Sequence, residues 1–353
     1  MTRPDFAYGN TRLHARRSAI LRSADFERLI GRDVDGLLGA LAATAYAADA
    51  EASRAPAGLR RLHDAIRTHL SRSLEELRSF YAGRARELVD VLLGRFDLHN
   101  MIAVLRAHAG THRPAEEALP ALIDMGWLVD PLAQEVLREG EFAGAIDLLA
   151  RSAPDRQQGS ALRAAFAEYQ RTEDLAALEH AVAGDHAARA VAALSGAGPS
   201  ARTLLRFTRR EIDERNLLIA LRLRDAPAPG AKAVDMLLAG GSIPPERVAT
   251  ALHAPAPSAV AALAPLGEGS WHAPLQQWAT SGDLVGLERE LQRRRLAAAA
   301  ALFVAGDPLS IDVPIAFAAA KRREARNLRL LAEASARGIH PDTVRRELLP
   351  EHP

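Results

Sequence analysis

Residues 96–107 read FDLHNMIAVLRA, a phrase in which an acid lies three positions before an asparagine that opens an apolar run. The phrase returns at 212–223 as IDERNLLIALRL and at 323–334 as REARNLRLLAEA. The asparagines are Asn100, Asn216 and Asn327, so more than a hundred residues separate successive copies. Small solenoid units recur every few tens of residues. This longer interval therefore predicts three large, related helical lobes.

The asparagines interrupt apolar helical stripes, most clearly in the first two copies. A buried amide needs hydrogen-bond partners, and either the acid one turn earlier or a neighbouring backbone group could supply them. The acids are Asp97, Asp213 and Glu324, whose spacing suits an intrahelical bond. We interpret the asparagines as structural. In the third copy Arg323 takes the place held by Phe96 and Ile212.

Two further patterns recur around the phrase. The segments GWLVDPLAQEVL, GSIPPERVATAL and GIHPDTVRREL, with Pro131, Pro245 and Pro341, predict joints in which glycine closes one helix and proline opens the next. Asp174 and Asp283 precede similar apolar-periodic segments, with Asp25 as a fainter relative, and an acid there is typical of a helix N-terminus.

The composition predicts an all-α protein. Alanine, leucine, arginine and glutamate dominate the 353 residues, aromatic residues make up 5%, and no sustained alternating strand pattern is present. We divide the chain into lobes at 1–140, 141–250 and 251–353, packed into one body, because the intervening loops are short. The N-terminus lacks the apolar stretch of a secretory signal, so we expect a cytosolic location.

Membrane spanning and nucleic-acid binding are both disfavoured. The longest apolar stretches, beginning at Leu37 and Leu296, fall short of the roughly 20 residues needed to span hydrocarbon. The net charge is +1, and the basic clusters are interleaved with acids and lack aromatic stacking partners.

The sequence predicts no catalytic, cofactor-binding or metal site. Neither Lys232 nor Lys321 lies in a phosphate-binding GxxxxGK[ST] context. His108 and His112 have the spacing of a helical metal pair, but Gly110 and Pro114 disrupt the helix and the glutamate of a zinc-protease motif is missing. The absence of cysteine removes disulfides and thiolate metal sites.

The same segments carry a resemblance to a known family. FAYGNTRLHARRSAILRSADFERLI and ELVDVLLGRFDLHNMIAVLRAHAG, together with the two later asparagine phrases, are similar to the C subunit of the prokaryotic V-type, or A-type, ATPases, which is equivalent to the d subunit of the eukaryotic vacuolar enzyme. The similarity covers essentially the whole chain and is most specific at residues 97–101.

The resemblance implies a funnel of three pseudo-symmetric lobes on the cytoplasmic face of the membrane. It also implies two partners, the membrane-embedded proteolipid rotor ring and the D and F subunits of the central stalk. The chain would then transmit torque for proton or sodium transport without a catalytic site of its own. A helical-repeat interaction scaffold is the alternative, and an enzyme with a pocket of perturbed titrating groups is a further one.

Arginines beside the repeated phrase are our candidate partner contacts. They precede the asparagines at similar positions, and the alternative is a solvated surface that pairs with nearby acids. The residues are Arg95, Arg209, Arg210, Arg322 and Arg323.

Overall fold

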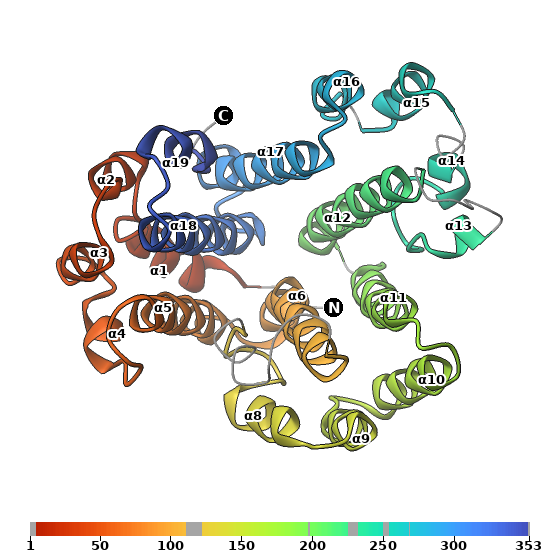
Figure 1. The fold of residues 1–353 in the computed structure, drawn as a ribbon, viewed down its shortest axis with the longest axis horizontal. Helices are drawn as coiled ribbons and strands as arrows, with labels where there is room; N and C mark the ends of the chain where they lie inside the picture. The colour runs from red at the N-terminus through yellow and green to blue at the C-terminus, as the bar shows by residue number, and fades with distance from the viewer. Residues whose placement is uncertain are drawn as a thin grey trace. The chain divides into compact units, whose positions relative to one another are not determined.

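The computed structural model describes residues 5–110, 122–196, 198–224, 232–249, 254–267 and 269–351. Every regular element within these ranges is a helix, so the all-α prediction is confirmed (Figure 1). None of the described helices is long and apolar enough to cross a membrane.

The chain divides into two compact units. Unit 1 comprises residues 1–154 and 296–353, and unit 2 comprises residues 155–295. The three lobes that we inferred from the repeat remain a prediction, since the two compact units have other boundaries than these lobes.

Unit 1 is built around α18 (Asp312–Ala336), which packs most extensively against α5 (Leu59–Ser79) (Figure 1). Residues 312–321 of α18 are buried without interruption, as expected of a helix surrounded by others on all sides. The remaining elements are α1 (Ala7–Arg17), α2 (Ser23–Leu29), α3 (Val34–Leu41), α4 (Ala47–Ala52), α6 (Gly83–His108), α8 (Asp130–Arg138), α9 (Phe142–Ser152) and α19 (Pro341–Glu347). The helix α17 (Leu284–Ala305) begins in unit 2 and ends in unit 1.

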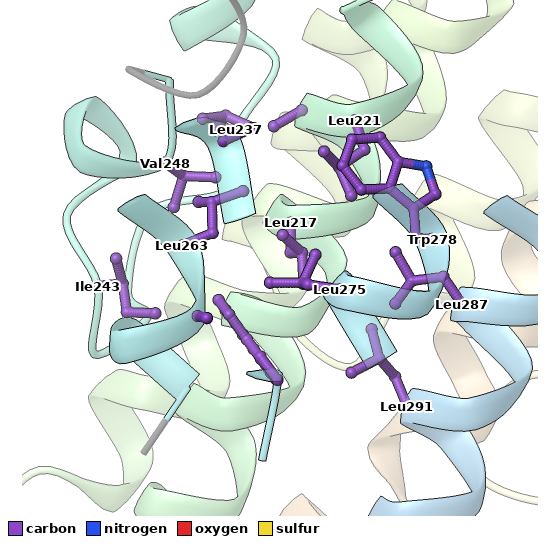
Figure 2. Close-up of a cluster of buried hydrophobic side chains, with 14 residues drawn as sticks. Leu217, Leu221, Leu237, Ile243, Val248, Leu263, Leu275, Trp278, Leu287 and Leu291 are labelled. Carbon is purple, nitrogen blue, oxygen red and sulfur yellow. The ribbon is translucent and has the colours of Figure 1, made fainter. Parts of the chain in front are cut away.

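Unit 2 begins with three helices in which each packs against the next: α10 (Arg156–Thr172), α11 (Leu175–Leu194) and α12 (Pro199–Leu223). Shorter elements follow: α13 (Lys232–Asp235), α14 (Pro245–Ala249), α15 (Ala256–Leu263), the 3-10 helix η2 (Ala264–Gly267) and α16 (His272–Ser281). An apolar cluster joins them, in which Leu217 and Leu221 of α12 meet Leu263, Leu275 and Trp278 (Figure 2). This cluster holds the short helices against α12, since helices of one or two turns are not stable alone.

The helix starts agree with the aspartate pattern. Asp174 accepts a hydrogen bond from the Ala177 amide at 3.0 Å, and Asp283 accepts one from the Gly286 amide at 2.8 Å. Asp25 lies inside the first turn of α2 and accepts from the Arg22 amide. Each carboxylate satisfies an amide that has no partner within its helix.

The glycine-proline joints differ from our prediction in two of the three copies. Proline begins α14 and α19 and stands second in α8, as expected. Gly338 follows α18 closely, whereas Gly241 lies six residues after the end of α13 and Gly126 follows residues 122–125, which are not helical. These two glycines have another role, described below, that depends on the acids of the repeated phrase.

The cluster in unit 2 gives a test of the fold. Leu263→Ala should lower the free energy of unfolding by about 2 to 5 kcal/mol, because it opens a cavity in a core that cannot collapse freely. Val285→Ala on α17 is the control, since Val285 is 74% exposed and should change stability by less than about 0.5 kcal/mol. Chemical denaturation measures both, and equal effects would contradict the packing of Figure 2.

Candidate functional site

The three repeated asparagines make the same two hydrogen bonds. Each is at most 1% exposed, donates through Nδ2 to a downstream carbonyl oxygen and accepts at Oδ1 from the amide of that same residue. The pairs are Asn100 with Ile123 (2.7 and 2.9 Å), Asn216 with Leu238 (2.8 and 2.7 Å) and Asn327 with Leu349 (2.9 and 2.9 Å). These bonds go to backbone groups, one of the two kinds of partner that we considered for the buried amides. The structural interpretation of the asparagines stays a prediction.

The acids of the first two copies bind the same downstream segment as their asparagines. Asp97 Oδ1 accepts from the Trp127 amide at 3.0 Å. Asp213 accepts from the amides of Ser242 and Ile243, both at 3.1 Å. In the described residues these contacts stand in place of the intrahelical bond that the spacing suggested, and they give acceptors to the amides of a partly buried turn.

Gly126 and Gly241 let that turn approach the acids. A Cβ at Gly126 would lie 2.0 Å from Asp97 Oδ1, and one at Gly241 would lie 2.1 Å from Asp213 Oδ1. Gly126 also has a φ of 83°, a conformation that L side chains rarely adopt. Asparagine, acid and glycine thus act together to hold one turn after each of these two long helices.

The acid of the third copy binds elsewhere. Glu324 is fully buried, and its Oε2 accepts from the Leu21 amide at 2.6 Å. Its Oε1 accepts from the hydroxyl of Tyr46 and from Lys321 Nζ, both at 2.5 Å. Burial, followed by the negative charge of Glu324, raises the pKa of Tyr46 well above its ordinary value.

A chain of polar contacts continues from Glu324 toward the surface. Lys321 Nζ donates to His69 Nε2 at 2.8 Å, and His69 Nδ1 lies 2.7 Å from Asp49 Oδ2. At the outer end of the chain Arg72 Nη2 donates to Asp49 Oδ2 at 2.7 Å. Burial and the charges of Lys321 and Arg72 lower the pKa of His69 to about 2. His69 is therefore neutral, with Nδ1–H donating to Asp49 and the Nε2 lone pair taken by Lys321.

Three members of this polar chain lie in the wall of a cavity of about 760 Å³ in unit 1. Its lining includes His69, Arg72 and Lys321, with Arg67, Arg16 and Glu76. Arg67 forms ion pairs with Asp64 and Asp130, and Arg16 pairs with Glu76. The cavity thus combines perturbed titrating groups with mixed charge, but its histidine has no lone pair left to act as a general base.

The candidate partner-contact arginines do not form one group. Arg323 is 4% exposed and donates through Nη2 to the Leu21 carbonyl at 2.9 Å, so its side chain is not on the surface as we expected. The apolar stripe accounts for this, because position 323 corresponds to the buried Phe96 and Ile212. Burial lowers the pKa of Arg323.

The other four arginines are partly exposed. Arg322 lies over the ring of Phe96 at 5.8 Å, and Arg210 pairs with Glu214 at 3.2 Å. Arg95 donates to the Leu92 carbonyl at 3.0 Å. The fourth is Arg209, one of whose guanidinium nitrogens, Nε, is buried without a hydrogen-bond partner in the described part of the chain.

His108, one of the two histidines that have metal-pair spacing, makes a hydrogen bond and a ring contact within the protein. His108 Nε2 lies 2.9 Å from the Val136 carbonyl oxygen and its ring stacks on Phe142, while His112 lies outside the described residues. No group of three or more metal-ligating side chains occurs within the described ranges.

Sequence reasoning missed His69, Asp49 and Tyr46, and for Lys321 it excluded a phosphate-binding loop without pointing to a buried role. The single available signal was that Lys321 is one of two lysines in a chain that otherwise uses arginine. The partners come from distant segments, so no local spacing pointed to them.

Comparison of the sequence with known proteins identifies one family and its members. The sequence profile described as "ATP synthase (C/AC39) subunit" matches residues 9–347. The chain is 31% identical over 346 residues to the C subunit of the V-type ATP synthase of Thermus thermophilus, with 98% of each chain covered. It is 27% identical over 348 residues to the C subunit of the A-type ATP synthase of Haloferax volcanii, with 97% of each chain covered.

The asparagine contacts predict a stability loss on substitution. Asn100→Leu or Asn216→Leu leaves a buried amide and a buried carbonyl without partners, at a cost of about 1 to 3 kcal/mol for each group. Gln277→Leu on the exposed face of α16 is the control for the amide-to-leucine change. Thermal unfolding measures the effect, and unchanged midpoints in both asparagine variants would contradict the bracing role.

Asp97 predicts a pH dependence. Burial raises the pKa of Asp97 from 3.8 to about 6, against the lowering effect of the amides of Trp127 and Leu128. Between these pH values the folded chain binds a proton that the unfolded chain has lost, so stability falls as pH rises from about 4 to about 6 and is level above. The fall is at most about 3 kcal/mol.

Asp97→Asn removes this titration while keeping an acceptor for the Trp127 amide. Denaturation of both proteins from pH 4 to pH 8 gives the difference in unfolding free energy. We expect that difference to change across pH 4 to 6 and to be constant from pH 7 to 8. A difference independent of pH would contradict the raised pKa of Asp97.

Proposed function

Because the chain belongs to the ATP synthase (C/AC39) subunit family, we propose that it is the coupling subunit of a V/A-type rotary ATPase. In this role it joins the D and F subunits of the central stalk to the membrane proteolipid ring and transmits torque for ATP-linked proton or sodium transport. It acts at the cytoplasmic face of the membrane and performs no catalysis itself. The observation that carries the proposal is the family match over residues 9–347.

The described structure supports a mechanical role. A coupling must resist deformation, and in this chain the turns after the repeated helices are bonded at the asparagines and, in the first two copies, at the adjacent acids as well. Each buried contact of this kind opposes sliding between a turn and its helix, since sliding leaves buried polar groups unpaired.

The cavity of unit 1 is a candidate docking place for one partner. Its charges of both signs favour a polar protein surface over a small apolar ligand, since ligand pockets are mostly apolar with few polar groups. The partly exposed Arg95, Arg209, Arg210 and Arg322 stay our proposed contacts, whereas Arg323 leaves that set because it is buried. A helical-repeat scaffold remains the alternative function.

Co-purification tests the proposal. Tagged protein expressed with the other subunits should bring down the D and F type subunits and the proteolipid ring together. Arg209→Glu/Arg210→Glu and Arg95→Glu/Arg322→Glu should stay folded but retain less stalk or ring, and capture by the wild type should weaken more steeply with salt. Arg171→Glu is the control, since Arg171 is exposed on α10 and pairs with Glu168.

The possible results separate two questions. Failure of the wild type to capture either partner would overturn the coupling function and favour the scaffold. Capture by the wild type and by both double variants with equal affinity would leave the function standing and remove these arginines from the interface.

A further inference from the structure

The non-helical residues Ile20–Arg22 are bound by two buried charged side chains of α18. Glu324 accepts from the Leu21 amide at 2.6 Å, and Arg323 donates to the Leu21 carbonyl at 2.9 Å. Leu21, Arg323 and Glu324 are each at most 6% exposed. One residue of a remote segment therefore has both backbone groups held by adjacent side chains of one helix.

The first two repeats show what has changed in the third. There the residue before the acid is Phe96 or Ile212, which only packs, and the acid binds a turn that follows its own helix. Arginine in place of the apolar residue adds a hydrogen-bond donor. Glutamate in place of aspartate has a longer side chain, which extends to the Leu21 amide. The third repeat has thus become a binding site for an extended segment from the N-terminal end of unit 1.

Contacts on both sides extend the site. The Glu351 amide donates to Ser23 Oγ at 3.4 Å, and Arg345 of α19 pairs with Glu27 of α2 at 3.0 Å. Lys321 supports the acid from inside, since its ammonium donates to Glu324. The segment, α2, α18 and α19 also carry buried apolar side chains, among them Leu21, Phe26 and Val344. The polar bonds between them lose their strength together once water enters.

We propose that residues 20–23, which are the non-helical residues 20–22 and the first residue of α2, form a clasp. The clasp is seated in the Arg323–Glu324 site, ties α1 and α2 to α18 and α19, and opens as a unit before the rest of unit 1 unfolds. Opening exposes the backbone of residues 20–23 and of residues 348–351 together, and it therefore also releases Leu349 from Asn327. The packed pair α5 and α18 stays closed. The proposal concerns the fold of this chain and does not depend on the coupling function.

Hydrogen exchange under native conditions, read by mass spectrometry on the full chain, tests the clasp. Amides of residues 20–23 and 348–351 should share one opening equilibrium, and α5 should exchange more slowly. Arg323→Met should raise that opening about tenfold or more while leaving the exchange of α5 unchanged. Arg337→Met, which removes an exposed ion pair with Glu333 on the same helix, is the control.

A disulfide gives the second arm, because the chain has no cysteine of its own. Oxidised Ser23→Cys/Glu351→Cys should suppress the shared opening, also in the Arg323→Met background, and reduction should restore it. Equal acceleration of α5 and the clasp in the Arg323→Met variant would show that the site contributes only to global stability and would overturn the proposal. Exchange of residues 20–23 that is independent of residues 348–351 would overturn it as well.

Discussion

The requirement that buried backbone groups be paired governs the construction of this chain. After each repeated helix the chain turns back through the interior, where water cannot satisfy its amides and carbonyls. An asparagine amide answers this need because it presents one donor and one acceptor side by side, the arrangement that a neighbouring strand would offer. The chain contains four asparagines, and the fourth, Asn10, is also buried, donating to the carbonyls of Pro308 and Ser310 and accepting from Tyr81.

The acid beside each asparagine shows how one repeated device can acquire different roles. In the first two copies Asp97 and Asp213 reinforce the asparagine by binding the same turn. In the third copy a longer acid and an adjacent arginine hold a different segment, and the acid gains Lys321 and Tyr46 as further partners. Each charged member of this group has a polar partner, although Arg323 Nε is buried without a hydrogen-bond partner among the described residues. Removal of one member leaves the others with an uncompensated cost of desolvation.

Features that depend on residues close in sequence could be predicted, whereas contacts between distant residues could not. The burial of Asn100 and Asn216 could be predicted, since helical periodicity places them on an apolar face. The partners of Asp97 could not, because a turn some thirty residues away leaves no pattern within a helix. Two patterns disagreed at Arg323: its pairing with Arg322 suggested a surface, and its stripe position indicated the interior, where the structure places it. The cluster of Asp49, His69 and Lys321 joins three segments, and its single signal in the sequence was the rarity of lysine at Lys321.

The same contacts imply an order of assembly. Asn100 and Ile123 are close in sequence, as are Asn216 and Leu238, so each loop closes at little entropic cost as soon as its own residues are available. The contact of Leu21 with Glu324 spans most of the chain and must wait until α18 has been synthesised. During translation the N-terminal helices therefore exist for a period with Leu21 unpaired, although the asparagine-braced loops behind them are already in place. A long-range closure of this kind leaves apolar surface exposed while it waits, and in this protein it depends on two adjacent residues of α18.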